Sequence, residues 1–273
     1  MVAFGWQAIF VVLGVAGVIL ATAFFVYYRS PEEHRRVSES ELSYIVGERA
    51  TQSLTAARVS WLDLFKCRQV WGMMIGYFCV IWIWNIFIVF LPLYLQEARG
   101  VSIKGTGILA SIPYFGAALL GIFGGYAMTQ YTKRSGRDPL TAKRHVMAVS
   151  AIMAGILICV IPFVASLPMT IFVMTIALGF VATMQAAAWA MPGDIVDNSQ
   201  VASVGAIQNF GGYFGGAFAP VLTGMIADAT GSYTPSFVIG GIIASMAAVA
   251  YTGLVRRPLD GRGALVGPDG VGR

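Results

Sequence analysis

The chain has 273 residues, of which 57% are hydrophobic and only 11% are charged, and its mean hydropathy is +0.74. Soluble domains carry roughly 25% charged residues, so a chain this poor in charge could not cover a surface that faces water. The net charge of +5 does not indicate nucleic-acid binding, because the basic residues lie in short loops between apolar runs, as the positive-inside rule predicts for a membrane protein.

Seven apolar segments are long enough to cross a bilayer, which takes about 20 mostly apolar residues. They are residues 8–28, 70–95, 105–131, 146–166, 169–191, 203–227 and 234–255. None has a Lys, Arg, Asp or Glu in its central part. The first segment has no basic residue before it and no small-residue cleavage site after it, so it is predicted to span rather than to be a signal peptide. The predicted fold class is all-α, a polytopic bundle of about seven transmembrane helices.

The basic residues predict the orientation. Sixteen of the eighteen lie after the first span, after the third span or in the tail, and the other two, Arg99 and Lys104, share the loop after the second span. Alternating loops of a helical bundle lie on opposite sides, so the basic loops share one side, which should be cytoplasmic. We therefore predict a multi-pass protein of the cell (inner) membrane, with Met1 outside and Arg273 in the cytoplasm.

One polar insert, residues 29–68, separates the first span from a predicted six-helix domain at 69–256, which a cytoplasmic tail at 257–273 follows. Within the insert, Ser38 followed by Glu41 is typical of a helix N-terminus. Leu42, Ile45 and Val46 then recur at helical spacing. This pattern predicts an amphipathic helix on the membrane surface, and a solvated linker is the alternative.

No metal, cofactor or catalytic site is predicted. Cys67, Cys79 and Cys159 fit no metal or redox spacing, and we expect no disulfide because thiols within apolar runs behave as small hydrophobic groups. His34 and His145 have no second ligand nearby. An intramembrane enzyme has little support, because no nucleophile motif and no paired Asp lies within a span.

Glycine is concentrated in the third and sixth spans, where it forms pairs four residues apart. These pairs are Gly121/Gly125, Gly211/Gly215 and Gly212/Gly216. Small residues at this spacing let helix backbones approach closely in a membrane. Static packing and the rocking of transporter helices would use the same surface, and the glycines alone do not separate the two.

Five segments carry a resemblance to a known family. They are Tyr28-Arg29-Ser30-Pro31-Glu32-Glu33-His34, Phe90-Leu91-Pro92-Leu93-Tyr94-Leu95, Trp189-Ala190-Met191-Pro192-Gly193-Asp194, Gln208-Asn209-Phe210-Gly211-Gly212 and Thr230-Gly231-Ser232-Tyr233. They resemble, in order, the central loop, the seventh, tenth and eleventh helices and the following outer loop of the major facilitator superfamily. The similar branch is that of the anion:cation symporters, which includes hexuronate, aldonate, glucarate, tartrate and phthalate carriers. The resemblance covers about residues 3–258.

The resemblance implies that residues 1–28 correspond to the family's sixth helix and that an N-terminal half is missing. In the family that half holds the coupling acids and the substrate-binding arginines. The implied function is the C-terminal part of a secondary active transporter that moves small organic anions (sugar acids or carboxylates), coupled to protons when intact. The alternative is a truncated or non-transporting membrane subunit or scaffold with a small-molecule binding wall. One position departs from the family: Thr129 follows Gly125 where the cytoplasmic latch has Asp.

Amide side chains within the spans are the candidate binding groups, because an amide without partners in hydrocarbon costs several kcal/mol. Gln185 and Trp189 share a face of the fifth span, and Asn209 shares a face of the sixth with Tyr213. An amide beside a ring suits a hydroxylated organic anion, since the ring packs on carbons while the amide binds hydroxyls. The resemblance also implies that Asn209 and Trp189 line the substrate cavity.

The predicted substrate-binding residues are Asn209, Trp189, Asn85, Gln185 and Tyr77. Membrane lipids surround the chain in this prediction. The alternative for each residue is an interhelical contact, and such a hydrogen bond contributes about 1 kcal/mol. Gln208 lies about 100° from Asn209 around its helix and is assigned to structure. Asp194 and Asp197 could pair with loop arginines as a gate or simply be solvated at a helix end.

Overall fold

The computed structural model describes residues 7–33, 37–44, 61–256 and 259. The chain divides into two compact units, Met1–Thr55 and Ala56–Arg273. In the first unit, α1 (Gln7–Tyr27) is a continuous apolar helix and η1 (Pro31–Glu33) is a short turn. Ser38 begins the next helix as predicted, because its Oγ accepts a hydrogen bond from the Glu41 amide at 3.2 Å. Of the predicted amphipathic face, Leu42 lies in this helix, whereas Ile45 and Val46 lie outside the described residues.

The second unit contains six long helices among its described residues. They are α4 (Arg68–Leu93), α5 (Ile103–Ser135), α6 (Pro139–Val160), α7 (Leu167–Ala190), α9 (Asn198–Thr230) and α10 (Thr234–Leu254). Short elements join them: α3 (Trp61–Leu64), a π-helical turn η2 (Tyr94–Ala98), η3 (Ile161–Phe163) and α8 (Pro192–Ile195). With α1 they give seven helices long and apolar enough to span a membrane in the described part of the chain. The predicted all-α bundle and its seven spans are confirmed.

The two longest helices, α5 and α9, extend further than predicted. Each has 33 residues, about 50 Å of helix, because polar residues continue the helix beyond its apolar part. Each ends at a glycine in the left-handed conformation, Gly136 with φ 61° and Gly231 with φ 64°. A side chain would strain the backbone there, so these glycines define where the two helices stop.

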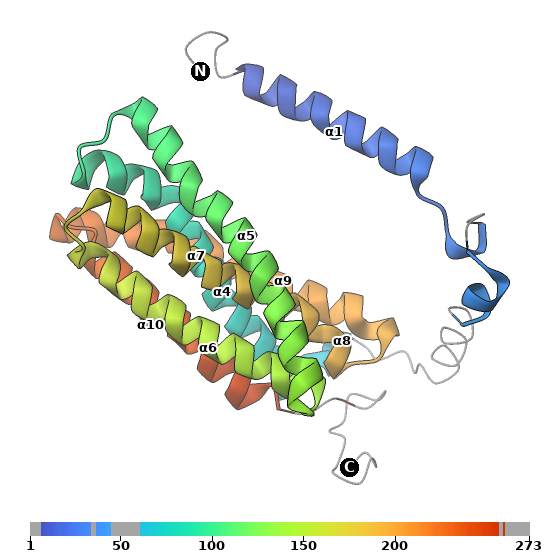
Figure 1. The fold of residues 1–273 in the computed structure, drawn as a ribbon. Coiled ribbons are helices and arrows are strands. Elements are labelled where there is room, and N and C mark those ends of the chain that lie inside the picture. The colour runs from blue at the N-terminus through green and yellow to red at the C-terminus, as the bar shows by residue number, and fades with distance from the viewer. Residues whose placement is uncertain (1–6, 34–36, 45–60, 257–258, 260–273) are drawn as a thin grey trace. The chain divides into compact units, whose positions relative to one another are not determined.

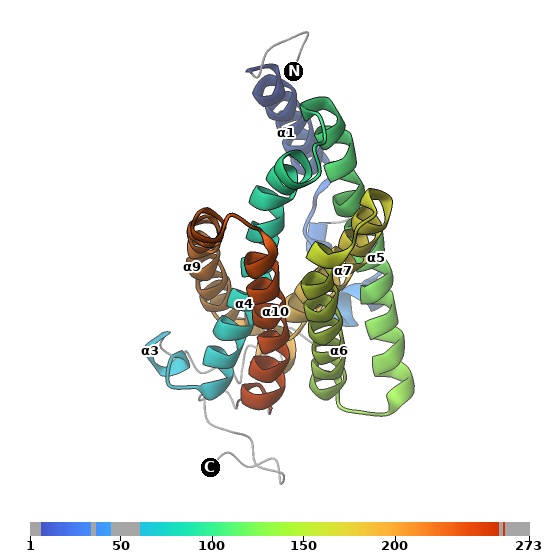
Figure 2. The ribbon, with the colours of Figure 1, turned by 90° about the vertical axis from the view of Figure 1, so that its left-hand side faces the viewer.

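The helices pack as two equivalent triplets. The most extensive contacts join α4 to α9, α5 to α7, α6 to α10, α4 to α10 and α6 to α7. Exchanging α4, α5 and α6 for α7, α9 and α10 leaves this set unchanged. Figure 2 shows the result, with α9 and α5 on the flanks and α4, α10, α6 and α7 between them. Because the chain enters α4 and α7 from opposite ends of the bundle, the triplets form an inverted repeat of the kind found in transporters.

Glycines make the close contacts between the triplets. On α9, Gly211, Gly212, Gly215 and Gly216 face the side chains of α4, so both predicted pairs on this helix are used. On α5, Gly121 faces Ala182 of α7, but a Cβ on Gly125 would meet nothing within 4 Å. The predicted Gly121/Gly125 pair is therefore wrong: the neighbouring Gly124, which faces Thr183, makes the second contact. Figure 1 shows α5 lying along α7.

Candidate functional site

The centre of the candidate site is a contact between α4 and α7, the first helices of the two triplets. The Trp189 indole Nε1–H donates a hydrogen bond to the Tyr77 hydroxyl oxygen at 2.9 Å. The two rings pack edge to face with centroids 5.9 Å apart. Tyr77 is 1% exposed whereas Trp189 is 48% exposed. A buried tyrosine therefore holds an accessible tryptophan in a defined orientation.

Gln185 belongs to the same cluster. It lies one turn before Trp189 on α7, is partly buried, and is a second hydrogen-bonding partner of the Tyr77 hydroxyl. The predicted shared face of Gln185 and Trp189 is thus observed, and Tyr77 joins it from α4.

Helix α9 borders this cluster with a small residue followed by two polar ones. A Cβ on Gly205 would lie 3.7 Å from the Trp189 ring, so α9 passes directly beside that ring. One turn later comes Asn209, which is partly buried and makes no side-chain hydrogen bond within the described part of the chain. A further turn brings Tyr213, which is 60% exposed. We call Tyr77, Gln185, Trp189 and Asn209 the polar wall.

Asn85 lies apart from the polar wall. It is two turns beyond Tyr77 on α4, and its Nδ2 donates to the Ile81 carbonyl oxygen of its own helix at 2.9 Å. A Cβ on Gly216 of α9 would be 2.7 Å from that nitrogen. The structure thus brings four of the five predicted residues onto adjoining helices and places Asn85 in the packing between α4 and α9.

Gln208 connects α9 to α7. It is fully buried, and its Nε2 donates to the Ala188 carbonyl oxygen at 3.3 Å. Its Oε1 has no partner among the described residues. This interhelical contact agrees with the structural role predicted for Gln208.

One end of the bundle, which we call the basic end, is held by cations at helix C-termini. Arg68 donates to the Gly253 carbonyl oxygen of α10 at 2.7 Å, and Arg144 donates to the Tyr251 and Thr252 carbonyl oxygens of α10 at 3.2 and 2.5 Å. These groups satisfy carbonyls that have no partner within the helix and suit the negative end of its dipole.

Asp194 also lies at the basic end, where its partner is Lys143. The Lys143 Nζ is 2.6 Å from Asp194 Oδ2 and donates to the Ala190 carbonyl oxygen of α7 at 3.1 Å. Both side chains are about four-fifths buried, at 18% and 20% exposed. Two interpretations were predicted for Asp194, pairing with a loop arginine and solvation at a helix end, and both are wrong. Its carboxylate is instead largely buried and paired with Lys143, which lies near the start of α6.

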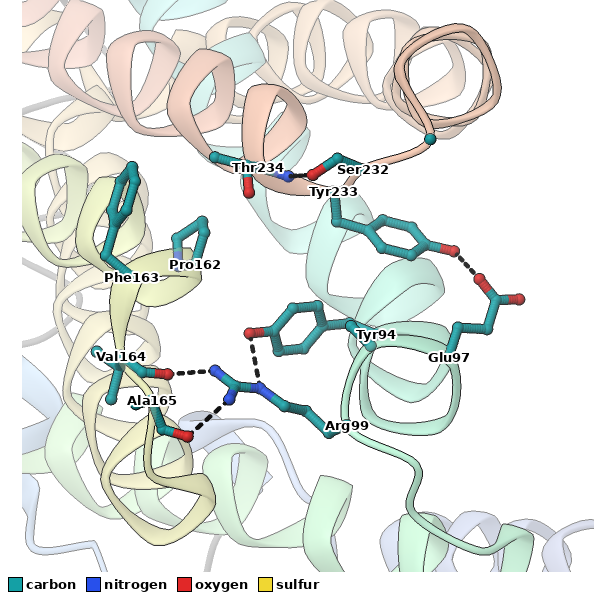
Figure 3. A pocket seen from close by; sticks show the side chains of 12 residues that line it. Tyr94, Glu97, Arg99, Pro162, Phe163, Val164, Ala165, Ser232, Tyr233 and Thr234 are labelled. Atoms are coloured by element: carbon teal, nitrogen blue, oxygen red, sulfur yellow. Dashed lines mark hydrogen bonds between the residues drawn. The ribbon is translucent and has the colours of Figure 1, made fainter.

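The opposite end of the bundle contains a polar pocket of about 550 Å³. Figure 3 shows the Arg99 guanidinium directed at the carbonyl oxygens of Val164 and Ala165, with the latter at 2.8 Å, while its Nε donates to the Tyr94 hydroxyl at 3.0 Å. Arg99 thus fastens the end of α4 to the loop before α7. The sequence patterns missed this role, which depends on residues about 65 positions away.

Across the pocket, the Tyr233 hydroxyl donates to Glu97 Oε2 at 2.5 Å (Figure 3). Desolvation by burial, followed by this hydrogen bond and the Glu97 charge, raises the pKa of Tyr233 to about 12. The hydroxyl therefore keeps its proton at neutral pH and remains a donor.

The described residues contain no group of three or more metal-ligating side chains. Cys67, Cys79 and Cys159 form no disulfide with one another or with any other described residue.

A membrane bundle built from an inverted three-helix repeat, with polar and aromatic side chains where the first helices of the repeats meet, defines a multi-pass protein of the solute-carrier class. The chain belongs to the Major Facilitator Superfamily, whose profile matches residues 1–142 and 107–268. This confirms the resemblance seen in the sequence, and it confirms that the chain belongs to a family of transporters and not of enzymes.

Several curated relatives are transporters of organic anions. The chain is 29% identical over 262 residues to a probable L-galactonate transporter of Escherichia coli, covering 95% of this chain and 57% of the relative. It is 31% identical over 252 residues to a probable sulfoacetate transporter of Cupriavidus necator, covering 90% and 57%. It is 26% identical over 264 residues to a hexuronate transporter of Bacillus subtilis, covering 96% and 60%. The chain therefore spans little more than half the length of these relatives.

Proposed function

We propose that this chain is the C-terminal part of a secondary active transporter that moves small organic anions, either sugar acids or carboxylates, and that the intact protein is a proton-coupled symporter. The observation that carries the proposal is the Tyr77–Trp189 contact, which holds an accessible indole next to Gln185. Helix α9 passes beside that ring at Gly205, one turn before Asn209. Relatives named as galactonate and hexuronate transporters support the substrate class.

The polar wall suits the uncharged part of such a substrate. An indole face packs against carbon atoms, and amides donate to and accept from hydroxyls. A site built to bind hydroxyls rejects analogues without them strongly, because its polar groups are then left unpaired. The Asn209 amide, which has no partner in the described part of the chain, is the group that we assign to a substrate hydroxyl.

The polar wall has no cation for a carboxylate. The central parts of the spans contain no Lys, Arg, Asp or Glu. We therefore assign the substrate-binding cation and the coupling acid to the missing N-terminal half, so that residues 69–256 act as one six-helix half of the carrier. The runner-up is a truncated or non-transporting membrane subunit or scaffold, in which the same wall binds a small molecule without moving it.

We also propose that the basic end faces the cytoplasm and the Arg99 pocket faces outside, in the cell (inner) membrane. Among the described residues of the second unit, eight basic residues lie at the basic end and two, Arg99 and Lys104, at the other. This is the distribution that the positive-inside rule gives.

The test is uptake by proteoliposomes containing the longest reading frame that includes residues 1–273. Labelled hexuronate, aldonate and dicarboxylate are offered with and without an inward proton gradient. We expect accumulation of a hydroxylated anion that Asn209→Ala reduces at least tenfold. Gln96→Ala should leave it unchanged, since the Gln96 amide donates to the Pro92 carbonyl oxygen one turn earlier. Undiminished uptake in Asn209→Ala would overturn the site. Binding of these anions without uptake by any frame would favour the subunit.

A further inference from the structure

An apolar groove lies on the outside of the bundle, away from the polar wall. Its volume is about 430 Å³, its floor is α7, and its sides are α5 and α6. It forms because α5 packs mainly against α7, and α6 packs mainly against α10 and α7, so that α5 and α6 touch each other much less. The lining includes Leu120, Phe123 and Ala127 of α5 and Phe180 of α7, and most of its surface is apolar.

The groove and the polar wall occupy opposite sides of α7. The residues of α7 on the groove floor are Ile176, Gly179, Phe180 and Thr183. At about 100° per residue, their mean direction is about 150° away from the mean direction of Gln185 and Trp189. A molecule in the groove would therefore be separated from the proposed substrate by the thickness of α7, and the groove is not an extension of the wall.

The length of the groove matches one leaflet. Its lining on α5 runs from Leu120 to Tyr131, which is about 16 Å of helix. Half of a 30 Å hydrocarbon core is about 15 Å. A single acyl chain that entered from the membrane surface would thus reach from one end of the groove to the other.

The end of the groove at Tyr131 lies at the basic end of the bundle. There the Tyr131 hydroxyl and the His145 Nδ1 are 3.1 Å apart and form a hydrogen bond from α5 to α6. The adjoining turn carries the exposed cations Lys133, Arg134 and Arg137.

None of these three cations makes a side-chain hydrogen bond or ion pair within the described part of the chain. The acid in this turn, Asp138, already caps α6 by accepting the Thr141 amide at 3.0 Å. The turn therefore presents free positive charge beside an apolar slot.

We propose that this groove binds one anionic phospholipid of the adjacent leaflet, with an acyl chain along α7 and the phosphate at the Arg134–Arg137 turn. Basic residues beside a cleft between transmembrane helices are suited to acidic lipid headgroups. The charge complementarity and the one-leaflet length both point to a lipid rather than to a peptide or a soluble anion.

The test titrates the purified 273-residue chain in detergent with palmitoyl-oleoyl phosphatidylglycerol or with phosphatidylcholine of the same chains, and counts retained lipids by native mass spectrometry. We expect one phosphatidylglycerol to be retained preferentially. Arg134→Gln with Arg137→Gln should weaken it by about fivefold per charge. Ala127→Phe, which places a ring in the groove, should weaken it about tenfold by displacing a few methylenes.

Matched controls lie elsewhere on the chain. Lys104→Gln removes an exposed cation from the other end of the bundle, and Ala118→Phe adds a ring to an exposed position of α5 outside the groove lining. Both should leave retention unchanged. Equal retention of the two lipids would overturn the headgroup site. Loss in the charge variants without loss in Ala127→Phe would overturn the groove, and competition by inorganic phosphate would show a soluble-anion site instead. The charge variants alter only exposed residues, so they test the proposal even where Ala127→Phe fails to fold.

Discussion

Replacing Tyr77 with Phe isolates the hydrogen bond that positions Trp189. The ring of Tyr77 is 1% exposed, and Phe keeps that ring, so no cavity forms. What disappears is the acceptor of the Trp189 Nε1–H, 2.9 Å away. Hydrogen bonds between transmembrane helices average about 0.6 kcal/mol and reach about 1.7 kcal/mol in double-mutant cycles. Because Gln185 also contacts this hydroxyl, we expect a loss of about 1 kcal/mol, which is about a fivefold change in the unfolding equilibrium.

The chain provides its own probes for this measurement. Cys67 and Cys79 are buried and are not in disulfides among the described residues, so a thiol-reactive dye reports their exposure as the protein unfolds in a denaturing detergent. Tyr77→Phe and Trp189→Phe, alone and together, form the cycle, and the second substitution should cost little once the first has been made. The control is Tyr114→Phe, because the Tyr114 hydroxyl is buried without a partner among the described residues and its removal should be neutral or stabilising.

Two results would refute this reasoning. If Tyr77→Phe destabilises the protein equally with Trp or Phe at position 189, the two side chains are not coupled by the hydrogen bond. If Tyr114→Phe costs as much as Tyr77→Phe, the loss reflects ring environment rather than the partner of the hydroxyl.

Three further predictions concern packing, charge and pH. Gly215→Ala should cost about 1–3 kcal/mol because its Cβ would overlap a ring of α4, whereas Gly107→Ala, with nothing within 4 Å, should be neutral or stabilising in the same dye assay. Asp194→Asn should cost about 1–3 kcal/mol because it leaves the partly buried Lys143 without its counter-ion, and adding Lys143→Gln should recover part of that loss. The pKa of Tyr233 is raised from an ordinary value of 10 to about 12, so the folded state holds this proton more tightly than the unfolded state does. Its contribution to stability is complete below pH 10 and is lost as the pH rises towards 12. Tyr233→Phe should therefore make the unfolding midpoint depend less steeply on pH between 10 and 12, and an unchanged dependence would contradict the assignment.

The spans could be predicted because hydropathy is a local property. Every span contains enough apolar residues to be recognised from its own sequence. The caps of α5 and α6 depend on equally local contacts but were not predicted: Ser102 accepts from the Gly105 amide at 3.2 Å and Asp138 from the Thr141 amide at 3.0 Å. Helix length was less predictable, because hydropathy marks the bilayer and not the end of a helix. In α5 the helix continues through Lys133 and Arg134 to Ser135.

The pairings between helices could not be predicted in this way. Gly124 and Gly125 are chemically identical, but one residue is about 100° of rotation, and only the fold decides which of them faces α7. The partner of Asp194 is likewise 51 positions away, at Lys143. Periodicity did place Gln185 with Trp189 correctly, since both lie on one helix. Periodicity alone did not show that Tyr77 and Asn85 have different neighbours. Tyr77 contacts Trp189 of α7, whereas Asn85 packs against Gly216 of α9.

The inverted repeat explains why the polar wall lies where it does. Exchanging the two triplets superimposes α4 on α7, so the symmetry axis of the repeat runs between these two helices. Tyr77 and Trp189 meet beside this axis, and each comes from the first helix of its triplet. The glycines of α9 and α5 bring each flanking helix close to the first helix of the other triplet, which fixes α4 and α7 from both sides. A site at this junction is packed against both flanking helices, and the central parts of its spans carry no Lys, Arg, Asp or Glu. In the proposed function, this site would recognise the shape and hydroxyls of the solute, and the cation for its negative charge would come from outside residues 69–256. On that proposal, the groups that recognise hydroxyls and the group that attracts the charge would belong to different parts of the carrier.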